Sequence, residues 1–223
     1  MELLATLFRI NAGGPELAGS PAWQADTLAS PSSYSNAVAG GNTGVTAVTT
    51  AINLSDPSLP VGTPQALFQT ERFDKSGAPN LLWDFPVAPG QYEVRLYFAE
   101  TWSGAFNNGV RVFDVKIEGA TVLDDYDIFA DVGANKGVMK SFVVTSDGNL
   151  DVDFFRVTQN PAVKGIEILS VSQTAGVLSA STAALDFGSV VAGQSVTLPL
   201  TLTNTAPAGA ASVTIDPAAA ALT

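Results

Sequence analysis

Residues 91–98 read QYEVRLYF, and this stretch decides the fold class of the 223-residue chain. Every second residue beginning with Tyr92 is apolar or aromatic, whereas Glu93, Arg95 and Tyr97 stand between them. Successive side chains of a β-strand point to opposite faces, so this alternation predicts one buried face and one polar face. The stretch is therefore expected to form a half-buried antiparallel strand.

The same two-residue period recurs on both sides of this stretch. Strands are predicted at residues 81–87, 111–117, 138–145, 149–157 and 163–171. Asp147-Gly148 favours a tight hairpin turn, and no apolar stripe with helical spacing is longer than two turns. Many short strands separated by turn residues are typical of an all-β protein, a β-sandwich or jelly roll.

The composition excludes several partners. The chain is 46% hydrophobic and 14% charged, which is enough apolar material for a buried core. Its net charge is −11 with only ten lysines and arginines, so it repels phosphate backbones and nucleic acid is not an expected partner. No apolar run reaches the ~18 residues of a membrane span, so membrane insertion is not expected.

The chain contains neither cysteine nor histidine. This excludes cysteine nucleophiles, Ser-His-Asp triads, histidine general bases and zinc sites built on these residues. The remaining enzymatic option is carboxylate chemistry.

Residues 30–63 differ from the rest in being rich in Ser, Pro, Gly, Ala, Thr and Asn. We expect long surface connections there, with at most short strands. Ordered loops on a rigid sandwich commonly carry binding groups.

The sequence changes character again after the last of these strands. Residues 173–177 are predicted to be a linker, and residues 185–205 to be two strands around the turn AGQ at 192–194. A complete immunoglobulin-type sandwich needs ~100 residues, and fewer than half that number follow the linker. We therefore expect one domain at 1–172 and an incomplete, truncated immunoglobulin-like β segment at 178–223, whose strands close no core.

Several short motifs follow one another along the first domain. They are FRINAGG at 8–14, WQAD at 23–26, LFQTERF at 67–73, FAE at 98–100, VFDV at 112–115, DIF at 127–129, NP at 160–161 and GIEI at 165–168. Together they resemble the malectin family, whose members bind carbohydrate, over residues 5–171. The resemblance implies a jelly-roll sandwich with a sugar cleft formed by loops at one end. Residues 185–190, LDFGSV, resemble the start of an abnormal-spindle-type immunoglobulin-like module.

The resemblance also implies binding residues. The family's binding aromatics correspond to Tyr34, Phe73 and Trp102, and a polar binding residue corresponds to Gln159. The founding animal member has Tyr in place of Phe73, a Tyr-Phe pair in place of Trp102-Ser103, and Asp in place of Gln159. The diglucose preference of that member is therefore not implied for this chain.

These residue types suit the chemistry of a sugar. An aromatic ring covers the C–H groups on one face of a pyranose at low entropic cost, and amides pair with its hydroxyls. In the loop that carries Trp102, we expect Phe106 to add a ring, and Asn107 and Asn108 to add hydrogen-bonding groups. Each of these side chains also has a structural interpretation, as a cap of the sandwich, a loop anchor or part of the core.

Glu71, Glu100 and Asp114 offer an enzymatic alternative, the carboxylate pair of a glycoside hydrolase that uses Glu71 or Glu100. That chemistry needs two carboxyl groups about 5–9 Å apart. In the structural interpretation, Arg72 pairs with one acid and anchors strand ends, because buried charges need partners.

Asp124, Asp125, Asp127 and Asp131 form a cluster that could hold a structural calcium ion. Calcium takes six to eight oxygen ligands, but the spacing here does not match a helix-loop-helix calcium loop. No cofactor is therefore expected.

We expect a non-catalytic, lectin-like module of a larger protein that binds oligosaccharides or glycans, with glucose-containing ones favoured. Its extracellular location follows from the resemblance, since residues 1–8, MELLATLF, carry no basic residue and show no signal peptide. Flanking domains of the parent chain are further expected partners. The alternatives are a structural or adhesive module and the carboxylate-dependent hydrolase.

Overall fold

The computed structural model describes residues 5–39, 41–75, 81–171 and 178–204. The chain divides into two compact units, Met1–Val171 and Ser172–Thr223. Each unit is described by itself.

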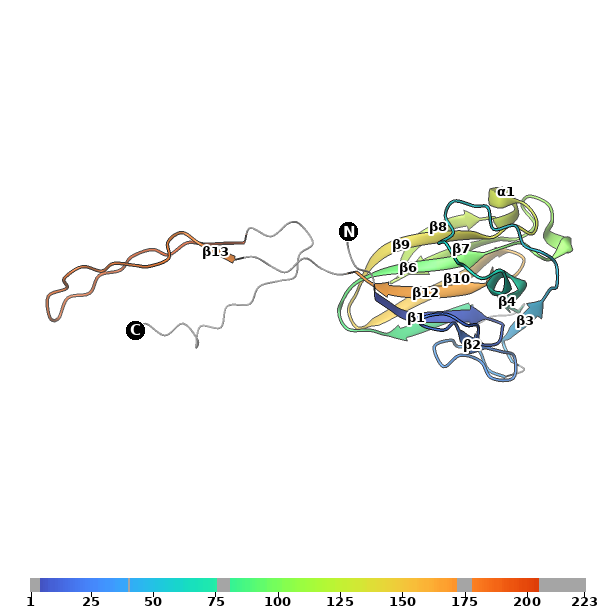
Figure 1. Ribbon diagram of the computed structural model, residues 1–223, viewed down its shortest axis with the longest axis horizontal. Helices are drawn as coiled ribbons and strands as arrows, with labels where there is room; N and C mark the ends of the chain where they lie inside the picture. Colours follow the sequence, from blue (N-terminus) through green and yellow to red (C-terminus); the bar gives the residue numbers. More distant parts are fainter. Residues whose placement is uncertain (1–4, 40, 76–80, 172–177, 205–223) are drawn as a thin grey trace. The chain divides into compact units, whose positions relative to one another are not determined.

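The first unit is built on two main β-sheets (Figure 1). The five-stranded sheet has the order β2 (Gln24–Asp26), β1 (Ala5–Ala12), β12 (Gly165–Ser170), β6 (Gly90–Phe98) and β9 (Val138–Ser146). The four-stranded sheet has the order β5 (Leu81–Pro86), β10 (Asn149–Thr158), β7 (Val112–Ile117) and β8 (Ala120–Tyr126). Neighbouring strands are antiparallel in both sheets, except for the parallel pair β1 and β2. The predicted all-β sandwich is confirmed.

A smaller sheet and short helices complete this unit. The sheet has the order β11 (Ala162–Val163), β4 (Thr70–Asp74) and β3 (Thr43–Ala47). The short helices are η1 (Gln65–Gln69), η2 (Ser103–Ala105) and α1 (Ile128–Val132).

The stretch at 91–98 lies in β6, as its alternation predicts. Val94, Leu96 and Phe98 are fully buried between the two sheets. Tyr97 differs from the expectation, because it is only 1% exposed although it points to the opposite face. A second apolar cluster covers that outer face, and it consists of Trp23, Ile52, Leu67, Phe68, Tyr97 and Ala99.

The main core lies between the five-stranded and four-stranded sheets and includes side chains from all four strands of the latter. Its largest fully buried members are Trp83, Phe85, Phe98, Phe113 and Phe154. Burial of each such side chain contributes about 1.5–3 kcal/mol relative to exposure. The core therefore provides a rigid frame for the loops at the ends of the strands.

The turn at Asp147-Gly148 does not close the hairpin expected from its sequence. β9 pairs with β6 in the five-stranded sheet, whereas β10 lies between β5 and β7 in the other sheet. Both edges of β10 are thus occupied, and the chain crosses from one sheet to the other at this turn. Gly148, with φ of 139°, supplies the unusual backbone conformation of the crossing.

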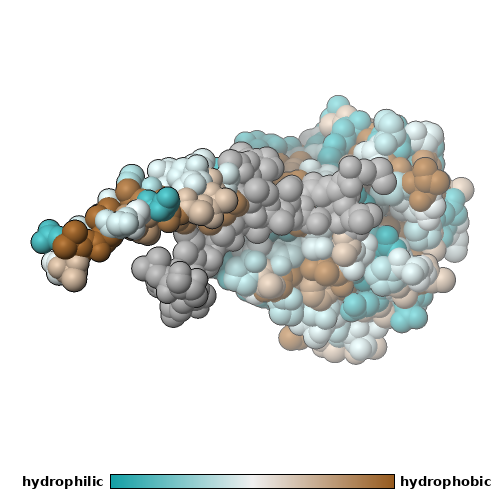
Figure 2. Space-filling model, turned by 60° about the vertical axis from the view of Figure 1, so that its left-hand side comes forward, coloured by the Kyte–Doolittle hydropathy of each residue, from teal (hydrophilic) through white to brown (hydrophobic). Residues whose placement is uncertain are grey.

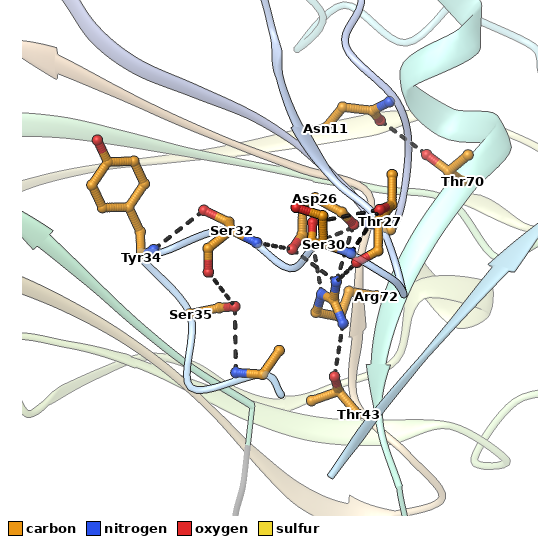
Figure 3. A network of polar contacts seen from close by, with 12 residues as sticks. Asn11, Asp26, Thr27, Ser30, Ser32, Tyr34, Ser35, Thr43, Thr70 and Arg72 are labelled. Atoms are coloured by element: carbon orange, nitrogen blue, oxygen red, sulfur yellow. Dashed lines mark hydrogen bonds and ion pairs between the residues drawn. The ribbon is translucent and has the colours of Figure 1, made fainter. Parts of the chain in front are cut away.

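A buried ion pair between Arg72 of β4 and Asp26 of β2 fixes the loop that follows β2 (Figure 3). Arg72 Nε lies 2.6 Å from Asp26 Oδ2, and both side chains are fully buried. Arg72 Nη2 also donates to the Thr27 carbonyl oxygen at 3.0 Å, and Ser32 N donates to Asp26 Oδ1 at 2.7 Å. Residues 30–63 form connections around the short strand β3, as expected.

The second unit contains a short antiparallel pair, β13 (Leu178–Ala180) and β14 (Leu202–Asn204). The predicted turn is present: Gln194 N donates to Val191 O at 2.9 Å, and Gly193 has φ of 86°. The two longer strands predicted around this turn are not formed, since β14 is the one strand assigned between residues 185 and 204.

None of the described residues 178–204 is buried. Phe187, Val191 and Val196 are 39%, 74% and 45% exposed, and Figure 2 shows hydrophobic residues along the surface of this unit. Two paired strands of three residues each cover too little apolar area to form a core. The immunoglobulin-like identity of this unit stays a prediction.

Candidate functional site

A cleft of about 520 Å³ opens where β3 and β4 meet the loops that follow β6 and β10. Its walls come from segments far apart in the sequence, so it exists only in the folded sandwich. The cleft is lined by Val45, Thr46, Val48, Glu71, Phe73, Thr101, Trp102, Ser103, Arg111, Gln159 and Asn160. The structure thus brings together three predicted binding residues, Phe73, Trp102 and Gln159.

Trp102 presents an open indole ring to the cleft, with 44% of the residue exposed. The ring lies directly on the backbone of Gly104, where a Cβ atom would come within 2.3 Å of Trp102 Cζ2. The Arg111 guanidinium carbon lies 5.8 Å from the ring centroid, within cation–π range. A fixed and open ring of this kind is a platform for a ligand.

Phe73 of β4 supplies the second ring and is backed in the same way. Gly44 of β3 is its partner in the β3–β4 ladder. A Cβ atom on Gly44 would come within 2.3 Å of Phe73 Cζ. Both rings of the cleft therefore rest against glycine backbone.

Gln159 adds a donor at the edge of the cleft. Its φ of 61° lies in the left-handed region, which is unusual for a residue other than glycine. Its side-chain Oε1 accepts a hydrogen bond from Asn160 N at 3.0 Å. The amide NH₂ group of Gln159 is the part of the side chain that can then donate to a ligand.

Four charged side chains make up what we call the floor of the cleft: Glu71 and Arg111 line it, and Glu100 and Lys164 pair with these two. Arg111 Nε lies 2.7 Å from Glu100 Oε2, and Lys164 Nζ lies 2.7 Å from Glu71 Oε2. Lys164 also donates to Thr101 Oγ1 at 2.7 Å. All four charged residues are at most 5% exposed.

Burial is the largest influence on the pKa values of two of these residues, Glu100 and Lys164. It raises the pKa of Glu100, against the opposing attraction of Arg111. It lowers the pKa of Lys164, against the opposing attraction of Glu71. Two acids and two bases balance one another, so the floor offers polar contacts without a net charge.

The two acids of the hydrolase alternative are held by other groups. Glu100 Oε1 accepts from Trp102 N at 2.9 Å, and Glu100 Oε2 pairs with Arg111. Glu71 Oε2 pairs with Lys164. Arg72 does anchor strand ends as expected, but its acidic partner is Asp26 instead of Glu71 or Glu100.

Tyr34 lies outside this cleft, so the structure does not bring it together with Phe73, Trp102 and Gln159. Its ring packs against Phe8 and Phe85, with centroids 5.0 and 5.4 Å apart. Tyr34 N donates to Ser32 Oγ at 3.3 Å, in the loop tied down by the buried ion pair (Figure 3). The anchored loop directs this ring onto the edge of the core.

The other aromatic candidate is also displaced. Phe106 stacks on Phe129, with ring centroids 6.1 Å apart and planes 18° from parallel. Asn107 and Asn108 are exposed, and neither they nor Phe106 line the cleft. The contributions of this loop to the cleft are Thr101, Trp102 and Ser103, which precede or begin η2.

Two of the acidic residues considered for calcium have separate structural partners. Asp127 caps α1 by accepting from Ala130 N at 3.0 Å, and Asp131 pairs with Lys140 at 2.8 Å. Asp124 and Asp125 are exposed. Over the described residues, no three acidic side chains converge on a position that could hold a metal ion.

Arg111 and Lys164 are the charged residues of the site that the sequence did not single out. Lys164 is a lone charge between Val163 and Gly165 in an otherwise apolar run, which is the signal that could have identified it. Its partner Glu71 is distant in sequence, so the pairing itself was not visible.

Comparisons with known proteins agree with this architecture. The model of the malectin domain family matches residues 6–176. Malectin-B of Xenopus laevis is 31% identical over 121 residues, which cover 47% of this chain and 42% of that protein. Receptor-like protein 4 of Arabidopsis thaliana is 34% identical over 92 residues, covering 40% of this chain and 15% of that protein. The chain therefore spans less than half the length of these relatives.

The fold has solved counterparts. The crystal structure of the ANX2 ectodomain from Arabidopsis thaliana superposes with a TM-score of 0.64 at 21% identity, covering 77% of this chain and 51% of that one. In the part of the chain that the structure describes, no helix has the length and apolar character to cross a bilayer. The family match spans most of the chain and coincides with the observed sandwich, and the chain therefore belongs to the malectin domain family.

Proposed function

We propose that the first unit is a non-catalytic carbohydrate-binding module that holds a glucose-containing oligosaccharide in its cleft. The observation that carries this proposal is the meeting of two backbone-supported rings, Phe73 and Trp102, in one cleft above a polar floor. Membership of the malectin family supports it. The cleft volume of about 520 Å³ falls within the usual range of small-molecule sites.

Each part of the cleft has a role in this proposal. Trp102 and Phe73 cover C–H faces of the sugar, which gives apolar contact at little entropic cost. The amide of Gln159 and the hydroxyl of Ser103 reach hydroxyl groups at the rim. Because the cleft is open and the ligand small, we expect dissociation constants between micromolar and millimolar.

The proposed setting is extracellular, within a larger protein. The family match and the fold shared with the ANX2 ectodomain support this placement. A weak single site would then gain avidity from repeated modules or repeated sugar units.

The test is calorimetric titration of the chain with maltose, cellobiose and laminaribiose. We expect Trp102→Ala to weaken disaccharide binding about 10-fold or more, because the substitution removes the larger of the two rings. Phe106→Ala is the matched control, an aromatic side chain removed from the same loop but outside the cleft. It should bind like the unaltered chain.

Undiminished binding by a folded Trp102→Ala variant would reject the named site. Absence of binding across a broad glycan panel would favour the structural or adhesive alternative. Release of reducing sugar that disappears in Glu100→Gln would favour the hydrolase.

A further inference from the structure

The ion pair between Glu71 and Arg111 at the floor of the cleft is left open. Arg111 Nη2 lies 3.9 Å from Glu71 Oε1, which is beyond hydrogen-bonding distance. Both residues line the cleft. Among the residues that the structure describes, none donates a hydrogen bond to Glu71 Oε1 or accepts one from Arg111 Nη2.

The gap is held open by the other contacts of the same two side chains. Glu71 Oε2 is drawn to Lys164 Nζ at 2.7 Å. Arg111 Nε donates to Glu100 Oε2 at 2.7 Å, and Arg111 Nη1 donates to the Asn160 carbonyl oxygen at 2.9 Å. Neither side chain can approach the other without losing a buried partner, which is costly.

The gap matches the size and chemistry of a hydroxyl group. An oxygen about 2.7 Å from Glu71 Oε1 and about 2.9 Å from Arg111 Nη2 fits the opening with an angle of about 90° at that oxygen. A hydroxyl can donate to the carboxylate and accept from the guanidinium at the same time. We infer that one hydroxyl of the bound sugar bridges Glu71 and Arg111, an inference that rests on the proposed function of the cleft.

This bridge selects a neutral sugar. A carboxylate in the gap would face Glu71 Oε1, and an ammonium group would face Arg111 Nη2, so either charge meets repulsion on one side. Glu100 and Lys164 balance the charge of the floor and leave no surplus to attract an ion. A hydroxyl satisfies both sides with charge-assisted hydrogen bonds.

The test uses the full chain and the disaccharide that binds most tightly among maltose, cellobiose and laminaribiose. Calorimetry compares this sugar with its complete set of monodeoxy derivatives. Loss of the bridging hydroxyl should weaken binding about 10- to 100-fold, since both charged partners lose a hydrogen bond. Loss of other hydroxyls that lack charged partners should change binding by less than about 3-fold.

Arg111→Lys is the protein arm of the experiment, because it keeps the charge and removes Nη2. In this variant the penalty for the critical deoxy sugar should be smaller than in the unaltered chain, because only the hydrogen bond to Glu71 is then lost with the hydroxyl. Where the variant does not fold, nitrogen NMR of the Arg111 side chain replaces it. The parent sugar should shift the guanidinium signals, and the critical deoxy sugar should not.

Three outcomes overturn the inference. If all deoxy sugars weaken binding equally, no single hydroxyl forms the bridge. If the relative affinities of the deoxy sugars are unchanged in Arg111→Lys, Arg111 takes no part in it. Tighter binding of a uronic-acid disaccharide than of its neutral counterpart contradicts the preference for a neutral sugar. If binding depends on Trp102 in each of these cases, the proposed function stands without the bridge; if no disaccharide binds the unaltered chain, both fail.

Discussion

At the scale of single residues, the cleft depends on two positions that carry no side chain. Gly44 and Gly104 have no left-handed backbone requirement, and what they provide is space for a ring. Phe73 and Trp102 are consequently placed by the main chain instead of by neighbouring side chains. Placement of this kind costs little ordering entropy when a ligand arrives.

Replacement of Gly104 with alanine tests this placement. The new Cβ would lie 2.3 Å from Trp102 Cζ2, so the indole must swing away while the fold remains. We expect sugar binding to weaken about 10-fold and the free energy of unfolding to change by less than about 1 kcal/mol. Titration calorimetry and urea unfolding measure the two effects.

Gly90→Ala is the control for this substitution. Gly90 lies at the start of β6, where a Cβ atom has no neighbour closer than 3.7 Å. Unchanged binding by Gly104→Ala would show that the ring position is not set by the glycine.

The sequence predicted some site residues and missed others for a physical reason. Phe73 closes the LFQTERF motif, and Trp102 follows the FAE motif at the end of β6, so both could be assigned to the site from the sequence. Tyr34 lies in a loop whose course is set by a long-range ion pair. Arg111 meets Glu71 only through tertiary structure, and no local pattern encodes such a pairing.

At the scale of elements, strand existence was predictable and sheet membership was not. The alternation at 91–98 gives β6, because periodicity reports which side of a strand is buried. The same logic cannot say which neighbour a strand takes. β9 and β10 look like a hairpin in sequence, yet they lie in opposite sheets.

The Arg72–Asp26 pair should be the strongest single link between β4 and β2. Arg72→Ala leaves a fully buried carboxylate without its cation, and we expect a loss of about 3–5 kcal/mol in unfolding free energy. Lys140→Ala, which breaks the surface pair with Asp131, should cost less than about 1 kcal/mol. Urea unfolding of both variants measures these changes. Equal losses in the free energy of unfolding would contradict the role of the Arg72–Asp26 pair as the strongest link.

The β5–β10 pair predicts a pH dependence. Asp151 lies opposite Asp84 in the ladder, and burial together with Asp84 raises the pKa of Asp151 to about 6. The folded chain thus holds this proton more tightly than the unfolded chain. The stabilisation is complete below about pH 4 and is lost as the pH rises through about 6.

Asp151→Asn should therefore be more stable than the unaltered chain at pH 7.5, by about 1 kcal/mol after allowance for solvent screening. The difference should vanish near pH 4, as followed by urea unfolding at both values. Asp124→Asn, at an exposed position of β8, is the control. A constant difference across this range would contradict the proton linkage.

At the scale of the whole molecule, the two units should differ in stability. The described residues 178–204 bury no side chain, whereas the first unit has its own core. Residues 1–171 alone should melt within about 2 °C of the full chain, as judged by calorimetry. Hydrogen exchange should be fast across 178–204, and protection there equal to that of β6 would contradict this view.

The glycine-backed rings also bear on how such a module can diversify. A related domain that recognises another sugar cannot add a side chain at Gly44 or Gly104, because the Phe73 and Trp102 rings already contact the main chain there. Other positions that line the cleft, such as Thr46, Val48 and Gln159, can vary without disturbing this contact. A change of ligand preference would thus come from substitutions at these lining positions, while Gly44 and Gly104 remain glycine.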